Sequence, residues 1–317
     1  MDYSHIFRQT WNVLRRSGDL WALGFAALSL SLMSNLITRL GGRWVTSQAL
    51  TAGPDIATQV EQWLVQLGRP GPIVLGVVGL MGWFLLIWLV MTVGEAGMIH
   101  AAATTHKGHP ATLLESVRAG WRLLIPFVAI DTVVFLPLFV LILVMMLIGA
   151  AALIISIIWG AQSGQVSAFV LPVVLGGAIV LLLSFLLIPT TLVTMLFRTL
   201  AFRAAALLHL GVRESIHHTW QLIRQKTGPV IILAALIYGL SYLVGIASAV
   251  VLMPLSFLEG TPSFSALASG PSPAVLFSPL TLIVVFLNVV IAYGVQVLTT
   301  VAGSTFWTVA YQDLTEE

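Results

Sequence analysis

The chain contains no cysteine among its 317 residues. Disulfide bonds, thiolate zinc sites and cysteine nucleophiles are therefore excluded. Charged residues are also scarce, at 8% of the chain against about 25% in ordinary soluble domains. Hydrophobic residues make up 58%. So few charges could not cover the surface of a water-soluble fold of this size, so we expect an integral membrane protein.

Motifs for catalysis and phosphate transfer are absent as well. The sequence has no Walker A, GxSxG or HExxH pattern and no paired-carboxylate motif. The net charge of +2 is too small to recruit nucleic acid. We therefore expect no catalytic residue, no cofactor and no nucleic-acid partner.

Six apolar runs are long enough to cross a bilayer. They cover about residues 20–37, 73–94, 125–159, 168–192, 229–254 and 279–303. This pattern predicts an all-α integral membrane protein with about six transmembrane helices, forming a single membrane domain over residues 1–317. A secretory signal is the competing interpretation of the first run. That run is longer than the usual signal core, and no clear cleavage site follows it.

Several spans have unusual lengths or boundaries. The helix from residue 73 is predicted to continue to His106 and so to project from the membrane. The third span is too long for one straight crossing and predicts tilt, a kink near Pro137 or a short interfacial segment near 150–160. Residues 38–72 and 255–278 are predicted to be loops, the first containing a short surface helix.

Three segments carry the same pattern around a tryptophan, and each precedes an apolar run. Apolar residues recur eight and four positions before the tryptophan and three positions after it, which places them on one face of a helix. The three sets are Tyr3, Phe7, Trp11 and Leu14; Leu113, Val117, Trp121 and Leu124; and Val212, Ile216, Trp220 and Ile223. We predict three amphipathic interfacial helices on the cytoplasmic side.

The same pattern predicts a three-fold internal repeat, with units at about residues 1–106, 107–209 and 210–317. Each unit would hold an interfacial helix and two spans. The alternative interpretation is that a tryptophan-anchored amphipathic helix is a general way of entering a bilayer.

Basic residues are divided unevenly between the two sides of the predicted membrane. Eleven of the 14 lysines and arginines lie in the N-terminal segment or in residues 95–122 and 193–228. The exceptions are Arg39, Arg43 and Arg69. The positive-inside rule then places both termini in the cytoplasm.

Basic residues close to the three tryptophans predict anchoring to anionic lipid headgroups on the cytoplasmic side. A headgroup site with selectivity is the alternative to anchoring alone. The candidate anchors are Trp11, Arg15, Arg16, Trp121, Arg122, Trp220, Arg224 and Lys226.

Four polar residues fall within or beside the spans, namely Asp131, Glu95, Asn35 and Asn288. A carboxyl group inside a membrane is costly, so Asp131 is the leading candidate for ion or proton coupling. Its alternative role is one polar contact to another helix, for example to Asn35, Tyr238, Asn288 or Tyr293. We expect no basic residue at its depth.

Histidines and glycines supply weaker candidates. His106 with His109, and His217 with His218, lack the three or four converging ligands that a metal needs, so we predict no metal site. The glycines at 76, 79, 82, 176 and 177 predict faces for close helix packing.

Several segments together resemble a known family. They are AAATTHKG (101–108) and AAALLHLG (204–211), the GVRESIHHTWQLIR segment (211–224), the N-terminal Trp-bearing helix and Tyr311. The pattern is similar to uncharacterised bacterial six-helix membrane proteins, including the membrane domain attached to some glycerophosphoryl diester phosphodiesterases. The resemblance implies a fold and the bacterial inner membrane. We expect no such catalytic domain in this chain, so no catalytic residue carries over.

These observations support three hypotheses about function. The first is a non-enzymatic integral membrane protein that contacts lipids or a membrane protein partner. The second is a small-molecule or lipid transporter with a site between repeat units. The third, an enzyme acting on lipid, is the weakest because no nucleophile and base can be assembled at one depth.

Overall fold

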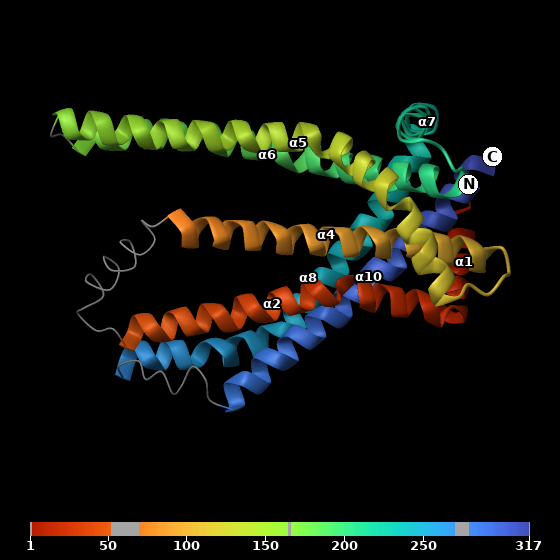
Figure 1. Cartoon of the computed structure of the whole chain (residues 1–317), viewed down its shortest axis with the longest axis horizontal. Coiled ribbons are helices and arrows are strands. Elements are labelled where there is room, and N and C mark those ends of the chain that lie inside the picture. The colour runs from red at the N-terminus through yellow and green to blue at the C-terminus, as the bar shows by residue number, and fades with distance from the viewer. Residues whose placement is uncertain (1, 52–69, 164–165, 270–278, 317) are drawn as a thin grey trace. The chain divides into compact units, whose positions relative to one another are not determined.

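A computed structural model describes residues 2–51, 70–163, 166–269 and 279–316, which are helical almost throughout (Figure 1). This part of the chain contains no strand. The helices are α1 (Tyr3–Arg16), α2 (Gly18–Thr51), α4 (Pro70–His106), α5 (Leu113–Ser163), α6 (Val166–Leu207), α7 (Val212–Gln225), α8 (Thr227–Ser269) and α10 (Pro279–Glu316). All but α1 and α7 are long and apolar enough to cross a membrane. Within the described residues, the prediction of an all-helical chain with six such helices is confirmed.

Two helices extend well into the predicted loops. Helix α2 continues to Thr51 and α8 to Ser269, so the loop predictions for residues 38–51 and 255–269 are wrong. In the extension of α2, serine and glycine reduce helix stability by about 1 kcal/mol per residue or less, which is not enough to end a helix that has already formed. The short surface helix predicted within residues 56–67 lies outside the described residues.

Helix α5 joins two elements that the sequence predicts as separate. The Trp121 segment continues without a break into the third span, giving a helix of 51 residues, or about 76 Å. Around Trp11 and Trp220, by contrast, the chain leaves the helix six residues later, at Ser17 and Lys226. The Ser17 hydroxyl accepts a hydrogen bond from the Leu20 N–H and so begins α2. Phe127 holds the corresponding position in α5, and its side chain cannot accept such a bond.

Two compact units make up the chain. The first contains residues 1–124 and 228–317, and the second contains residues 125–227. Unit 1 therefore holds α1, α2, α4, α8, α10 and the start of α5. Unit 2 holds the rest of α5 with α6 and α7. The boundaries of the proposed repeat units come from the sequence pattern and differ from the boundaries of these two compact units.

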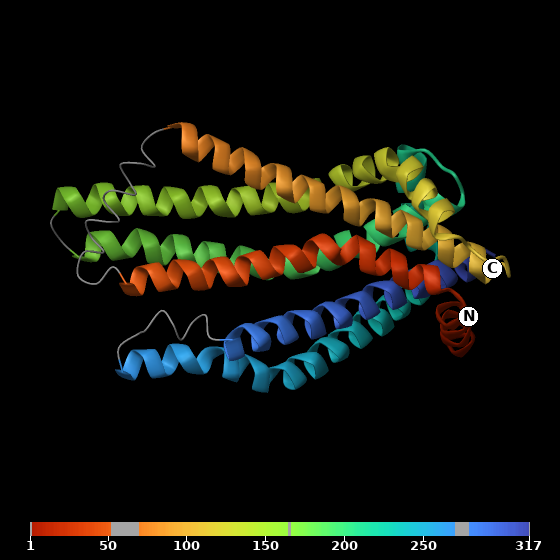
Figure 2. The same ribbon diagram turned by 60° about the horizontal axis from the view of Figure 1, so that its bottom comes forward.

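The packed core of unit 1 involves the N-terminal half of α2 and the C-terminal halves of α4 and α10. Helix α10 packs against α1, α2 and α4, and its course beside α2 can be followed in Figure 2. Glycines allow this close approach: a Cβ at Gly24 would overlap Val301 of α10, and one at Gly94 would overlap Ala27 of α2. The core side chains include Val13, Leu14, Leu20, Leu23, Leu28, Met98, Ala101, Ala102, Ala111, Val297 and Val301.

Away from this core, large apolar side chains face outward. On α4 the exposed residues include Val74, Leu75, Leu80 and Phe84. Lipid is the solvent that such a surface requires. The packing prediction for the glycines at 76, 79, 82 and 177 is wrong, because a Cβ at each would meet no atom within 4 Å. It holds for Gly176, where a Cβ would overlap Ala152.

Asp2 caps the N-terminus of α1. Its carboxylate accepts hydrogen bonds from the Ser4 N–H at 2.9 Å, the Ser4 hydroxyl at 2.8 Å and the His5 N–H at 3.3 Å. These bonds, chiefly the one from the Ser4 hydroxyl, hold the pKa of Asp2 below its ordinary value of 3.8. The cap therefore stabilises the first turn above that value, and the contribution is lost as the pH falls through the lowered pKa.

We expect Asp2→Ala to increase amide hydrogen exchange at Ser4 and His5 at neutral pH. The wild type should approach the exchange behaviour of the variant only in acid below the ordinary carboxyl pKa, after correction for intrinsic rates. Equal protection of these amides in the two proteins at pH 7 would contradict the cap.

Candidate functional site

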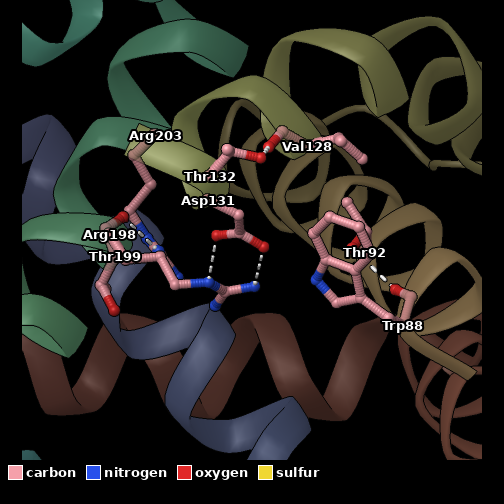
Figure 3. Close-up of polar contacts among 8 residues, drawn as sticks. All are labelled: Trp88, Thr92, Val128, Asp131, Thr132, Arg198, Thr199 and Arg203. Carbon is pink, nitrogen blue, oxygen red and sulfur yellow. Dashed lines mark hydrogen bonds and ion pairs between the residues drawn. The ribbon is translucent and has the colours of Figure 1, made fainter. Parts of the chain in front are cut away.

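A buried ion pair joins the two long helices of unit 2. The Nε–H of Arg198 in α6 donates to Oδ1 of Asp131 in α5 at 2.7 Å, and Nη2 lies 3.5 Å from Oδ2 (Figure 3). The Asp131 side chain is 2% exposed and that of Arg198 is 18% exposed. The expectation that no basic residue matches Asp131 is therefore wrong.

Two aromatic rings support the arginine. The Arg198 guanidinium carbon lies 4.2 Å from the centre of the Phe202 ring, a cation–π distance. Phe202 in turn stacks on Phe127, with ring centroids 3.9 Å apart and an interplanar angle of 27°. The guanidinium is thus fixed at one edge by a carboxylate and on one face by a ring, which sets the direction of its plane.

The antiparallel register of α5 and α6 explains why these residues meet. Asp131 lies 32 residues before Ser163, the last residue of α5, and Arg198 lies 32 residues after Val166, the first residue of α6. Phe127 and Phe202 are each 36 residues from the same two ends. Equal distances from the turn of a helical hairpin place residues side by side. The equality depends on the helix ends at Ser163 and Val166, which the structure supplies, so reasoning from the sequence did not identify Arg198.

The pair lies far from the turn of the hairpin. The 32 residues between the pair and the ends of α5 and α6 correspond to about 48 Å of helix, which is longer than the ~30 Å hydrocarbon core of a bilayer.

A second arginine of unit 2 is almost completely buried. Arg203 is 1% exposed, and its Nη1 donates to the Thr199 carbonyl at 2.6 Å. Figure 3 shows it on the same helix as Arg198. A buried guanidinium needs hydrogen-bond partners, and the preceding turn of its own helix supplies one.

The other predicted polar residues lie in unit 1, in separate local environments. Glu95 is partly buried on α4. Asn35 is exposed on α2 and donates to the carbonyl of Ser31 at 2.9 Å. Asn288 of α10 is buried and donates to the hydroxyl of Ser256 in α8 at 3.3 Å. Asn288 thus connects α10 with α8, whereas Asn35 satisfies a backbone carbonyl of its own helix.

The three tryptophans of the repeated pattern are all exposed. Trp11, Trp121 and Trp220 are 61%, 68% and 59% exposed. Among the basic anchor residues, Lys226 is half-buried, and Arg15, Arg16, Arg122 and Arg224 are exposed.

The residue that precedes each tryptophan is buried. These residues are Thr10, Gly120 and Thr219, and the residues at five positions before the tryptophan, Ile6, Ser116 and Ser215, are buried too. Successive residues are 100° apart around the helix axis. An arginine three positions before the tryptophan is therefore about 60° from it, and an arginine four positions after is about 40° from it. Both positions lie on the side of the tryptophan away from the buried residue. Each tryptophan thus lies between a protein-facing surface and a basic surface.

Histidines do not form a metal site in the described part of the chain. Within it, no group of three or more His, Cys, Asp or Glu side chains could hold a metal ion. Two exposed histidines instead pair with glutamines one turn later, His5 with Gln9 at 3.0 Å and His217 with Gln221 at 2.9 Å.

Comparisons with known proteins found no match to the chain among family models, curated proteins or solved structures. The functional argument therefore depends on the contacts, exposure and charges described above.

Proposed function

We propose that this chain is a non-enzymatic, multi-pass protein of the bacterial inner membrane that contacts anionic lipids. The observation that carries the proposal is the repeated exposure of Trp11, Trp121 and Trp220 next to exposed arginines. Tryptophan favours the membrane–water interface, because its ring is apolar and its N–H is polar. Each arginine or lysine near an anionic surface contributes about 1 kcal/mol of attraction.

The same arrangement supports amphipathic interfacial helices at α1, α7 and the first turns of α5. In each, the side facing the protein carries small or buried residues and an adjacent side carries the tryptophan. The shared arrangement also supports a three-fold repeat over about 1–106, 107–209 and 210–317. We retain the resemblance to bacterial six-helix membrane proteins as part of this proposal.

Orientation follows from the positive-inside rule rather than from the fold. Both termini and the three Trp-bearing segments would face the cytoplasm, because 11 of the 14 lysines and arginines lie with them. A membrane protein partner could share this surface with lipid. Anionic headgroups alone are enough to account for the positive charge of the surface.

The proposal predicts lipid-dependent protection of α1 and α7. Amide hydrogen exchange in both helices should be slower in nanodiscs containing phosphatidylglycerol than in nanodiscs of phosphatidylcholine alone. Replacing Arg15, Arg16 and Arg224 by glutamine should remove most of the difference, because the attraction is electrostatic.

Phe185→Ala provides the control for this experiment. Phe185 is an exposed aromatic residue of α6 with no adjacent arginine, so its removal should leave the lipid dependence unchanged. Equal exchange of α1 and α7 in the two kinds of nanodisc would contradict headgroup anchoring.

A transporter is the second candidate, favoured by the buried carboxylate of Asp131. We rank it second because transporter sites lie near the middle of the bilayer, and the ~48 Å of helix between this pair and the hairpin turn argues against that depth. Under this hypothesis Asp131→Asn should abolish flux of the transported solute in proteoliposomes while the protein stays folded. Flux that is unchanged in the variant would exclude Asp131 as a coupling residue.

A further inference from the structure

Each of the three Trp-bearing segments has one stripe of exposed side chains. The stripe contains the tryptophan and the residues seven before, three before and four after it, which lie within about 60° of one another around the helix axis. Every one of these side chains is exposed. The stripes are Ser4, Arg8, Trp11 and Arg15 in α1; Leu114, Arg118, Trp121 and Ile125 in α5; and Arg213, His217, Trp220 and Arg224 in α7.

The position three before the tryptophan differs between the segments in the kind of cation that it supplies. It is occupied by Arg8 in α1 and Arg118 in α5, which stay charged at any physiological pH, but by His217 in α7. A histidine side chain gains its positive charge only as the pH falls through about 6.5. The α7 stripe therefore has two permanent charges, on Arg213 and Arg224, and a third that depends on pH.

His217 lies on the side of α7 that faces away from α6, the helix against which α7 packs. The buried residues of α7 lie about 140–160° from His217 around the helix axis. They are Ser215, Thr219 and Leu222. The charged residues of α6 are Arg198, which pairs with Asp131, and Arg203, which is buried. The charge of His217 is therefore directed to the surroundings of the protein.

The side chains next to His217 on α7 leave its ring able to gain a proton. Nε2 of Gln221 lies 2.9 Å from the ring Nε2. Because an amide nitrogen can only donate, the ring nitrogen accepts in this contact and the imidazole is neutral. Glu214, the one acid of α7, accepts a hydrogen bond from the Gly211 N–H at 3.3 Å. A protonated ring has a hydrogen on Nε2 as well and can donate it to an anion.

We propose that the α7 stripe is a pH-dependent binding site for anionic lipid headgroups, with His217 as its switch. The inference rests on the proposed function and adds regulation to it. In acid the stripe presents three cations to lipid phosphates instead of two, next to the interfacial ring of Trp220. The stripe extends roughly 16 Å from Arg213 to Arg224, so one phosphate group cannot contact both ends, whereas adjacent headgroups of a bilayer can.

The test measures amide hydrogen exchange of α7 in the full-length protein at about pH 7.5 and about pH 5.5. Exchange is compared between nanodiscs containing phosphatidylglycerol and nanodiscs of phosphatidylcholine alone. The ratio of the two rates cancels the intrinsic effect of pH, and the phosphodiester of phosphatidylglycerol stays anionic at both values. We expect α7 to be about fivefold more strongly protected by phosphatidylglycerol at the lower pH, as one added cation provides. A ratio that does not change with pH would overturn the proposal.

Two substitutions at the same position test the cause. His217→Gln removes the charge and keeps a polar side chain, so protection by phosphatidylglycerol should stay at its high-pH value in acid. His217→Arg supplies the residue type of Arg8 and Arg118, so protection should be at its low-pH value throughout. A pH dependence like that of the wild type in either variant would overturn the role of His217.

His218→Gln is the matched control. His218 is half-buried and lies about 100° from His217 around the helix axis, outside the stripe. Its removal should therefore leave the fivefold rise unchanged. Loss of the rise in His218→Gln together with its persistence in His217→Gln would assign the switch to the wrong histidine and overturn the proposal. Thermal unfolding will show that each variant is folded.

The proposed function and this inference fail with different results. Equal exchange of α1 and α7 in the two kinds of nanodisc at both pH values would contradict headgroup anchoring, and the inference would fail with it. Slower exchange of both helices with phosphatidylglycerol, by a factor that does not depend on pH, would support anchoring and overturn only the switch.

Discussion

Asp131→Ala is expected to lower the free energy of unfolding by on the order of 3 kcal/mol. The substitution removes the carboxylate that lies 2.7 Å from the largely buried Arg198. Loss of a carboxylate partner from a largely buried arginine is costly because neighbouring apolar side chains and lipid tails cannot solvate its charge. Unfolding of the purified protein in mixed micelles, followed by far-UV circular dichroism, measures the effect.

A double-mutant cycle identifies the cause of this loss. Arg198→Gln alone should also destabilise, because it leaves the acid buried. Asp131→Asn with Arg198→Gln should recover most of the stability, since neither charge of the pair remains. Additive losses in the double variant would show that the two side chains do not interact in the folded protein.

Gly120→Ala is expected to produce the second large effect, a loss of about 1–3 kcal/mol in the free energy of unfolding. A Cβ at Gly120 would overlap the carbonyl oxygen of Val93 in α4 and lie 3.2 Å from the Gly97 backbone nitrogen. Because these atoms belong to the backbone, they cannot move aside as a flexible side chain could. The first turns of α5 would have to separate from α4. The same unfolding assay measures the change.

Gly79→Ala is the matched control in the same unit. No atom lies within 4 Å of the position that its Cβ would occupy. Alanine favours helix over glycine by about 1 kcal/mol, so this variant should be as stable as the wild type or slightly more stable. A loss at Gly79 equal to that at Gly120 would show that close α4–α5 packing is not the cause.

The two glycines show what a sequence pattern can and cannot predict in a membrane protein. The glycines at 76, 79 and 82 have the regular spacing of a packing face, yet the packed positions are Gly24, Gly94, Gly97, Gly120 and Gly176. In water, an apolar face must be buried against protein. In a bilayer, lipid is an equally good partner for it, so the pattern cannot show which face meets a helix.

The ion pair was missed for a related reason. Positive-inside counting assigned Arg198 to the cytoplasmic surface, and Asp131 was assigned to a span that begins at residue 125. Because α5 and α6 are antiparallel and each residue lies 32 positions from its helix end at Ser163 or Val166, both residues lie at one level. Charge counting treats each residue separately, whereas the pairing depends on the register of two helices.

The sequence by itself determined that this chain resides in a membrane as a set of long helices. Few charges and six apolar runs suffice, because a bilayer requires its spans to satisfy their backbone hydrogen bonds internally. Only the tertiary structure decided that Asp131 meets Arg198, that Gly120 rather than Gly79 is packed, and that the tryptophans face outward. Those outcomes depend on hydrogen bonds and steric fit between helices, and hydrophobicity does not distinguish among them in lipid.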